Sequence, residues 1–435
     1  MTDDERIDPQ EERLVSAEEQ LLETPTPPEP GGYAPSVAAR MALMQRAGGI
    51  VMPLVTTVFA FAMAMIVIAV TGHNPFKAFK GIFDGTGLNW LFPWTSSDDR
   101  TTAALNLQQT LIITTPLVLV GLAVAFAFRA GLFNIGGQGQ YLVGAYFAVW
   151  VGSSFDGMPK VLHIVLAIVV ASLAGAGWAG IAGLLKATVG AHEVISTIML
   201  NWIAVWVGVY LFGLNGPLQN SDPQQQSVPV SNDVASSAKR PVFWGDPELQ
   251  GLHIGLFIAL GAVLVFWVLV NRSKMGYEVR AVGFNPEAAR YGGISVARNY
   301  VLVMAVCGAF AGLAGAMDIL GWEFHLATND IQLASASGLG FIGIAVALLG
   351  RNTAGGTLAA ALLFGALLSG TSQRNLDPTI FEPELASNLT LIIQGLVVLI
   401  VSADVIVVTM LRRGRGLFRR RTPTAPAPAQ EAEAA

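Results

Sequence analysis

The ionisable side chains that could do chemistry in this sequence are few and widely spaced. His192 and Glu193 stand together at the start of an apolar stretch, and Asp404 lies inside another. His163 and His253 have apolar surroundings and lack the spacing of metal ligands or of a hydrolase triad. The sequence therefore predicts no catalytic or metal site, and the chemistry left open is proton or ion transfer by Glu193 or Asp404 within a membrane.

Amide side chains gather in a glycine-rich block, RAGLFNIGGQGQ, at residues 129–140. Each glycine costs a helix up to about 1 kcal/mol relative to alanine, so the block predicts a broken or re-entrant helix. Such a break is tolerated at membrane depth where it faces protein or a water-filled path. Asn134, Gln138 and Gln140 are candidate substrate contacts; the alternative is a tight cytoplasmic turn. Similar glycine-broken apolar blocks occur at 131–145 and 338–358, and paired interrupted helices often mark a midplane site.

The segment AHEVISTIMLN, residues 191–201, opens an apolar stretch with an ionisable pair. A carboxylate such as Glu193 at a helix N-terminus complements the helix dipole, which is a structural explanation for its position. The functional alternative is that His192 and Glu193 help to close a cytoplasmic gate or contact a partner protein on that side. Asn201 and Trp202 are expected to line a substrate pathway, although an amide within a span also commonly bonds to a neighbouring helix.

A carboxylate surrounded by aromatic residues occurs near residue 323. Glu323 lies between Trp322 and Phe324. Such a group could bind a pair of sugar hydroxyls while an aromatic ring stacks on the ligand. An aromatic belt at the membrane interface explains the aromatic residues equally well. Glu323 is therefore a further candidate for the substrate pathway.

A long charge-rich stretch, GYEVRAVGFNPEAARYGGI at 276–294, separates two apolar segments. The pair Asn285-Pro286 predicts a bend and the start of a short helix, which Gly292 and Gly293 should end. Small side chains within this helix would allow close approach to a partner, and the alternative is a solvated basic loop. The candidate docking residues are Asn285, Pro286, Glu287, Ala288, Ala289, Arg290 and Gly293.

The elements that position these residues are predicted to be membrane-spanning helices. Hydrophobic residues make up 53% of the chain and charged residues 13%, whereas soluble domains carry about 25% charged residues. A helix needs about 20 residues to cross a hydrocarbon core of ~30 Å, and only closed hydrogen bonding is tolerated there. The sequence thus predicts an all-α, polytopic bundle of about ten spans, at 50–71, 106–128, 135–152, 161–185, 195–213, 252–270, 299–319, 337–350, 354–370 and 387–411.

The distribution of charge predicts the orientation. The loop at 271–298 has five bases and two acids, whereas the loop at 214–250 has four acids and two bases. Because positive loops remain cytoplasmic, the first is expected inside, the second outside, and both termini inside. The 72–104 loop, with three bases and three acids, gives no direction by charge.

The two ends of the chain differ from the apolar body, which is predicted to be a transmembrane domain at 49–411. Residues 1–48 contain ten acids, four bases and several prolines, and are expected to be a disordered cytoplasmic tail. Residues 412–435 pass from an arginine-rich run into a Pro/Ala-rich tail. The arginines are expected to stay cytoplasmic and to meet anionic membrane lipids.

Four segments carry a resemblance that covers roughly residues 50–411. GLFNIGGQGQ, EVISTIMLN, AVGFNPEAARYGGI and GFIGIAVALLGR resemble the nucleoside or simple-sugar branch of the branched-chain amino acid and ribose permease superfamily. The EAAxxxG pattern of Glu287, Ala288, Ala289 and Gly293 is similar to the coupling segment of ABC importer permeases. Gln138 departs from relatives that often have Glu, which puts in doubt an ionic gate there.

The resemblance implies a ten-span type II ABC importer permease that is not itself an enzyme. ATP and Mg would be used by a separate ATPase, and this chain would need no cofactor. The resemblance also implies ABC ATPase subunits, a second permease subunit in a heterodimer and an extracytoplasmic substrate-binding lipoprotein as partners, with no nucleic acid. The expected location is the bacterial plasma membrane and the expected cargo a nucleoside. The alternatives are a simple-sugar ABC permease and an ion-coupled carrier.

Overall fold

Helices form most of the chain in the computed structural model, which describes residues 57–372 except 94, 156, 226 and 247–250, with a few more at 54 and between 388 and 399. The predicted sites at Asp404 and in both tails lie outside the described residues. The elements are a helix at Thr57–Val70, α3 (Pro75–Thr86), η1 (Leu88–Leu91), α4 (Ser97–Arg129), α5 (Gly137–Ser154), α6 (Lys160–Val189), α7 (Glu193–Phe212), β1 (Val242–Trp244), β2 (Leu252–His253), α8 (Gly255–Arg272), α9 (Lys274–Phe284), α10 (Pro286–Tyr291), α11 (Val296–Asp318), η3 (Ile319–Glu323), α12 (Thr328–Ser337), α13 (Leu339–Leu349) and α14 (Ala354–Gly370).

The predicted all-α membrane bundle is confirmed. Among the described residues, five helices are long and apolar enough to cross a membrane, and shorter apolar helices accompany them. Nine of the ten predicted spans coincide with a helix, and the last, 387–411, lies mostly outside the described residues. The span predicted at 337–350 is shorter than expected, because α13 begins only after a break at Gly338 and its 11 residues reach roughly 16 Å at 1.5 Å per residue.

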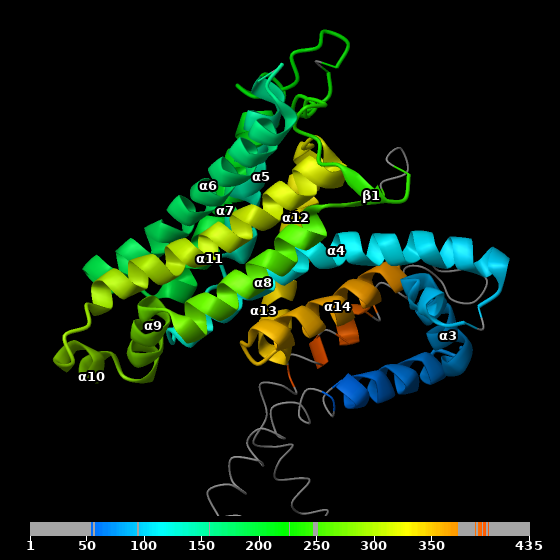
Figure 1. The fold of residues 1–435 in the computed structure, drawn as a ribbon, viewed down its shortest axis with the longest axis horizontal. Coiled ribbons are helices and arrows are strands. Elements are labelled where there is room, and N and C mark those ends of the chain that lie inside the picture. The colour runs from blue at the N-terminus through cyan, green and yellow to red at the C-terminus, as the bar shows by residue number, and fades with distance from the viewer. Residues whose placement is uncertain are drawn as a thin grey trace, which may run out of the picture. The chain divides into compact units, whose positions relative to one another are not determined.

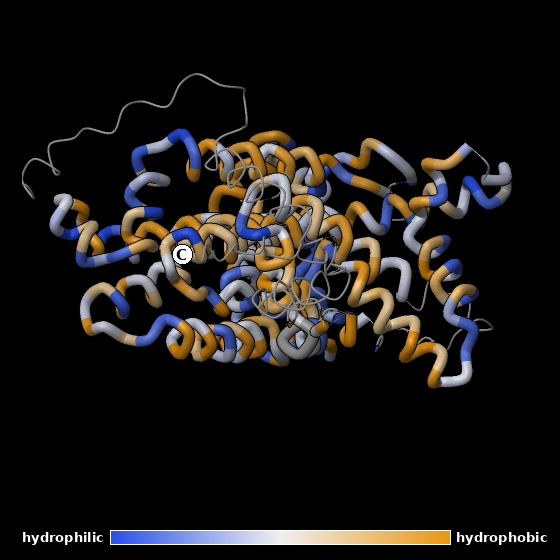
Figure 2. The backbone as a smooth tube through the Cα atoms, turned by 90° about the horizontal axis from the view of Figure 1, so that it is seen from below, coloured by the Kyte–Doolittle hydropathy of each residue, from blue (hydrophilic) through white to orange (hydrophobic). Residues whose placement is uncertain are grey.

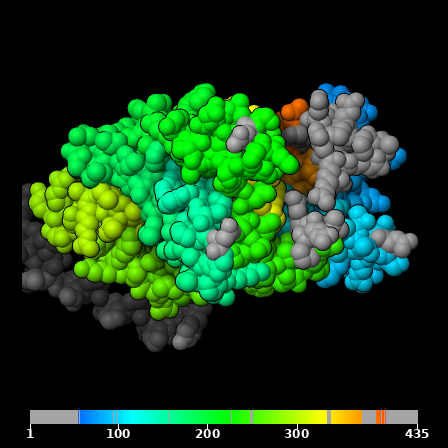
Figure 3. Space-filling model, turned by 90° about the horizontal axis from the view of Figure 1, so that it is seen from above, coloured from blue at the N-terminus to red at the C-terminus, as the bar shows by residue number. Residues whose placement is uncertain are grey.

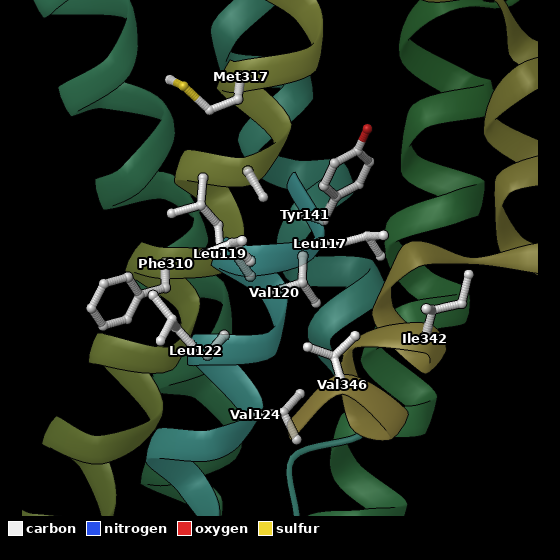
Figure 4. Close-up of a cluster of buried hydrophobic side chains, with 14 of the residues drawn as sticks. Leu117, Leu119, Val120, Leu122, Val124, Tyr141, Phe310, Met317, Ile342 and Val346 are labelled. Carbon is white, nitrogen blue, oxygen red and sulfur yellow. The ribbon is translucent and has the colours of Figure 1, made fainter. Parts of the chain in front are cut away.

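Helix α4 runs through the centre of the bundle. Its apolar window is 83% buried, whereas those of α6, α7 and α8 are each 28% buried and leave apolar faces uncovered. Uncovered apolar faces suit lipid or another membrane subunit. Figure 2 shows apolar residues through the middle of the bundle and more hydrophilic residues toward its ends. Figure 4 shows the core around α4, with Leu117, Leu119, Val120, Leu122 and Val124 facing Tyr141, Phe310, Met317, Ile342 and Val346.

Glycines bring α5, α6 and α11 into backbone contact. A Cβ atom added at Gly144 would overlap the backbone of Gly312, and one added at Gly308 would overlap the carbonyl of Gly175. Small residues at helix crossings allow this close approach in membrane proteins, where lipid gives no hydrophobic drive for association. These glycines therefore fix how the three helices cross.

The two ends of the bundle carry different segments. Figure 1 shows α9 and α10 at one end, whereas α3 lies at the opposite end and β1 lies toward it. Figure 3 shows the same separation from above, with the colours of α9 and α10 at one extreme and those of α3 and the start of α4 at the other. The 72–104 region, which charge did not orient, is thus placed opposite α10. The strands β1 and β2 form a short antiparallel pair. β1 lies in the 214–250 loop, whereas β2 occupies the first residues of the span predicted at 252–270, so the helix of that span begins later, at Gly255.

Candidate functional site

Two buried amides close the glycine-rich turn that precedes α5. Asn134 Nδ2 donates to Gln140 Oε1 at 3.1 Å, and Gln140 Nε2 donates to Asn134 Oδ1 at 3.0 Å. Asn134 Oδ1 also accepts from the backbone N–H of Gly136 at 2.9 Å. Both side chains are at most 1% exposed. The block thus forms a non-helical turn between the end of α4 at Arg129 and the start of α5 at Gly137, and its amides satisfy groups of that turn.

Asn201 of α7 holds the first turn of α5 from the side. Its Oδ1 accepts from the backbone N–H of Gly139 at 2.8 Å, and its Nδ2 donates to the carbonyl of Ile135 at 3.0 Å. The first N–H groups of a helix have no hydrogen-bond acceptor within the helix, so a buried N-terminus needs an acceptor from elsewhere, which Asn201 supplies. Gly139 is required here because an added Cβ would crowd the Asn201 backbone.

Gln138 joins α5 to the start of α13. Its Oε1 accepts from the backbone N–H of Gly340 at 2.9 Å, and a Cβ at Gly340 would overlap the backbone of Gln138. The two glycine-broken blocks at 131–145 and 338–358 therefore meet in space. Within the described part of the chain, Gln138 Nε2 is buried and has no hydrogen-bond partner. An unpaired buried donor is unfavourable by about 1 to 3 kcal/mol, so only one end of the Gln138 amide stabilises this contact.

The predicted pathway residues do not share one surface. Asn134, Gln138, Gln140 and Asn201 are buried together, whereas Trp202 is 53% exposed. Successive helical residues are rotated by about 100°, so Asn201 and Trp202 cannot both point toward α5. Direct contact of any of these residues with substrate stays a prediction.

We expect Asn201→Leu to destabilise the protein by about 2 to 6 kcal/mol, because two buried backbone groups each lose a partner worth about 1 to 3 kcal/mol. The thermal unfolding temperature of the purified protein in detergent measures this loss. Trp202→Leu, at the exposed neighbouring position, is the matched control and should unfold near the wild-type temperature. Equal unfolding temperatures for the two variants would show that Asn201 does not support α5.

The two residues predicted to form a gate, His192 and Glu193, lie in the turn between α6 and α7. Glu193 Oε2 lies 2.6 Å from the Lys186 Nζ at the end of α6, and this Nζ lies 5.3 Å from the centre of the Tyr300 ring on α11. His192 Nδ1 accepts from the backbone N–H of Val194 at 3.3 Å and caps α7. The ion pair with Lys186 was not predicted, although a base and an acid flanking Gly190 were a signal for it. The gating role stays a prediction.

The charge-rich stretch folds as predicted into a short helix with defined ends. Asn285 Oδ1 accepts from the N–H groups of Glu287 at 3.0 Å and Ala288 at 3.1 Å, so it caps α10. Proline in the first turn suits a helix start, where its missing N–H is not needed. Gly292 caps the other end, and Gly293 takes a φ of 79°, a conformation that favours glycine.

The outward face of α10 differs from the expected one. Ala289 is 5% exposed and packs against Val282 and Val296, so it supports the chain's own fold and is not presented to a partner as predicted. Ala288 is exposed. Phe284 and Tyr291, which flank α10, are 90% and 93% exposed. Two aromatic rings so exposed in a charge-rich segment are typical of an interaction surface, and the sequence interpretation overlooked them.

The helix α9 is packed against the start of the glycine-rich break. A Cβ atom at Gly283 would overlap the carbonyl of Arg129, and one at Gly131 would come within 3.2 Å of the Gly283 carbonyl. Arg280 Nη1 donates to the carbonyl of Val270 at 2.7 Å, which fixes α9 to α8. A displacement of α9 would therefore reach the segment that leads into α5.

A second polar cluster lies where α11 passes into η3, a π-helical turn. Asp318 Oδ2 accepts from the Tyr141 hydroxyl at 2.5 Å, and Oδ1 accepts from Trp322 Nε1 at 3.0 Å. Arg240 reaches in from the loop at 214–250 and donates through Nη2 to the carbonyl of Met317. π-helical turns are frequent at functional sites, and this one joins α5, α11 and the loop.

The arginine in this cluster is buried with a histidine. Arg240 is 3% exposed and His253 is 1% exposed. Burial, followed by the charge of Arg240, lowers the pKa of His253 to about 2, so this ring is neutral. Glu323 ends η3 and is partly buried, and its contact with substrate stays a prediction. Arg240 lies 77 residues from Met317, so no local spacing could have revealed this pairing.

Comparison with known proteins agrees with this architecture. Residues 106–402 match the family described as branched-chain amino acid transport system / permease component. Similar proteins include the guanosine ABC transporter permease protein NupP of Bacillus subtilis, 38% identical over 75% of this chain and 87% of that protein. The nucleoside ABC transporter permease protein NupB of Lactococcus lactis is 30% identical over 85% and 94%, and the glucose ABC transporter permease protein TsgB13 of Haloferax volcanii is 33% identical over 74% and 80%. No solved structure was found to match. The chain therefore belongs to the family of branched-chain amino acid transport system permease components, as a multi-pass ABC permease subunit whose ATPase is a separate protein.

Proposed function

We propose that this permease imports nucleosides. The observation that carries the proposal is the 38% identity to a guanosine permease over most of both chains, joined by a second nucleoside permease at 30%. A simple sugar is the second candidate, because a glucose permease is 33% identical to this chain. It ranks second because that match covers a smaller share of both chains than the match to the nucleoside permease of Lactococcus lactis. Substrate would pass from an extracytoplasmic binding lipoprotein into the permease.

Energy would enter through α9 and α10. Two ATPase subunits would use ATP and Mg to close on each other, and this closure would displace α10. They would contact the exposed surface formed by Glu287 and by the rings of Phe284 and Tyr291. The backbone contact of Gly283 with the 129–131 segment would carry this motion toward α5. The bond of Gln138 Oε1 to Gly340 lies where α5 and α13 meet and could open or close with it. Such a rigid lever biases a bundle between two states without chemistry in the permease itself.

The docking of an ATPase on α10 also sets the proposed orientation of the chain in the membrane. With α10 cytoplasmic, α3 and the 214–250 loop would face outward in a bacterial plasma membrane, and both termini would be cytoplasmic. The tails at 1–48 and 412–435 would lie inside, with the arginine-rich run against lipid. A second, different permease would complete a heterodimer, since the EVISTIMLN form resembles the larger of two permeases. The uncovered apolar faces of α6, α7 and α8 offer surfaces for it.

Uptake of labelled guanosine by the reconstituted complex tests the substrate and the energy source together. We expect ATP-dependent accumulation that survives collapse of proton and sodium gradients, and that excess unlabelled glucose does not reduce. Competition by glucose but not by adenosine would replace the nucleoside with a sugar. Loss of uptake on collapse of the gradients at constant ATP would favour an ion-coupled carrier. Of its two candidate carboxylates, Glu193 is paired with Lys186 at 2.6 Å, and Asp404 lies outside the described residues.

A further inference from the structure

Tyr300, near the start of α11, lies between the α9–α10 segment and the end of α6. It packs against a small apolar cluster of Val282, Ala289 and Val296, which joins α9, α10 and α11. The Lys186 Nζ at the end of α6 lies over the Tyr300 ring, 5.3 Å from its centre. One side chain therefore contacts both the segment that carries α10 and the helix α6.

A hydrogen bond beside this cluster also attaches α9 to α11. Asn299, the residue before Tyr300, donates through Nδ2 to Glu278 Oε2 of α9 at 3.3 Å. The Asn299 side chain is buried, as are the three members of the apolar cluster. Packed interiors have low compressibility and transmit strain. A displacement of α10 would therefore move the first turns of α11 with it.

Tyr300 meets α6 at two positions that lie on one face of that helix. A Cβ atom added at Gly183 would come within 2.9 Å of the Tyr300 carbonyl oxygen and of the Val301 Cα atom, so the two backbones are in direct contact. Lys186 is three residues further along α6, and residues three apart on a helix are neighbours on its surface. Its ammonium is attracted to the face of the Tyr300 ring. Tyr300 thus holds the end of α6 to the start of α11.

Lys186 extends this connection from α6 to α7. Its Nζ lies 2.6 Å from Glu193 Oε2, and the two side chains are only 22% and 11% exposed. An ion pair that is partly buried is screened less by salt than an exposed one. The ammonium is shared between the Glu193 carboxylate and the Tyr300 ring. A shift of the ring would therefore act on the ion pair that joins α6 to α7.

We propose that Tyr300 is a positioning residue for transport, which carries the displacement of α10 to the turn between α6 and α7 through Lys186. The inference rests on the proposed entry of energy at α10, and it adds a route separate from the contact of Gly283 with the 129–131 segment. Because Asn201 of α7 holds the first turn of α5, this route reaches α5 from a second direction. Chains of packed side chains and ion pairs of this kind carry coupling between distant sites.

The test compares Tyr300→Leu with Tyr300→Phe in the complete reconstituted complex. Leucine offers no ring face to the ammonium, whereas phenylalanine keeps one. We expect guanosine uptake per ATP hydrolysed to fall about tenfold in Tyr300→Leu, within the usual range of coupling between sites, while the ATPase rate and the KM for guanosine stay at the wild-type level. Tyr300→Phe should keep the wild-type ratio. A purely structural role would instead lower the yield of complex and leave uptake per ATP unchanged in the assembled fraction.

A second cation–ring pair supplies the matched control. The Arg272 guanidinium lies 5.5 Å from the centre of the Trp267 ring, and both residues belong to α8, so their contact joins no two helices. Trp267→Leu removes a ring face from a cation, as Tyr300→Leu does. It should leave uptake per ATP hydrolysed unchanged.

A label on α6 detects the transmitted movement without any transported substrate. Val189→Cys places a fluorescent label at the end of α6, where Val189 is 72% exposed. Labelling of the purified permease before assembly is selective, because Cys307, its single native cysteine, is buried. Addition of the ATPase with a non-hydrolysable ATP analogue should change the signal in the wild type and in Tyr300→Phe, but not in Tyr300→Leu.

These measurements separate failure of the inference from failure of the proposed function. Wild-type uptake per ATP and a wild-type label signal in Tyr300→Leu would overturn the inference. Normal ATPase recovery and uptake in Glu287→Arg would remove the route through α10, and the inference with it. If the wild type imports no nucleoside, only the cargo assignment fails, and the label signal still decides the role of Tyr300.

Discussion

Glu287→Arg is expected to lower recovery of the ATPase with the permease by about 30-fold or more and to abolish uptake, while the permease itself stays folded. Glu287 Oε2 lies 3.3 Å from Arg290 Nη1, and both side chains are more than 60% exposed. An exposed pair of this kind contributes at most about 1 kcal/mol to stability. A reversed charge at the centre of an interface, by contrast, commonly costs about 2 kcal/mol or more of binding free energy, which is the loss that defines a hot-spot residue.

Co-purification of the ATPase with tagged permease, at matched permease levels, measures this effect. Lys160→Glu, an exposed charge reversal at the start of α6, is the control and should leave recovery unchanged. Replacing both Phe284 and Tyr291 with serine tests the exposed aromatic rings separately and should also reduce recovery. Wild-type recovery and uptake in Glu287→Arg would show that α10 does not carry the contact.

Gly175→Leu is expected to prevent assembly of the bundle. Gly175 on α6 meets the Gly308 carbonyl and the Gly312 backbone on α11, and a side chain there would overlap backbone atoms. Backbone cannot move aside as a flexible side chain can, so the two helices would have to separate and lose much of their shared interface. The expected decrease in the free energy of unfolding is about 3 kcal/mol or more, at or above the upper end of the usual range for overpacking.

The yield of monodisperse protein in size-exclusion chromatography and its unfolding temperature measure the loss. Gly177→Leu is a matched control on the same helix, because an added Cβ there meets no atom within 4 Å. Both variants make the same chemical change in one apolar helix, so a general effect on insertion would be shared. Normal yield for Gly175→Leu, or equal loss in the two variants, would contradict the crossing described above.

The spans and α10 could be predicted because their signals are local. Each apolar stretch carries its own hydropathy, and Asn285 caps the helix that begins at the next residue. The start of α13 could not be placed to the residue, because Ser337 and Gly338 border the apolar run and the contact of Gly340 with Gln138 joins distant parts of the chain. A segment's hydropathy does not show where tertiary contact interrupts it.

The hydrogen-bond partners of the candidate site residues lie far from them in the sequence, so residue spacing could not predict them. The bond from Gly139 to Asn201 joins residues 62 apart, and the bond from Gly340 to Gln138 joins residues 202 apart. The inward direction of Ala289 likewise depends on Val282 and Val296 in the neighbouring helices. Sequence indicated that these amides and alanines matter, and packing decided which atoms they meet.

The measurement that bears most directly on the central claim compares vesicles that contain the permease subunits alone with vesicles that also contain the ATPase, each supplied with binding lipoprotein and guanosine. The account predicts accumulation against a gradient only when the ATPase and ATP are both present, and none when Glu287→Arg replaces the wild-type permease. Accumulation by the permease vesicles without any ATPase would contradict it.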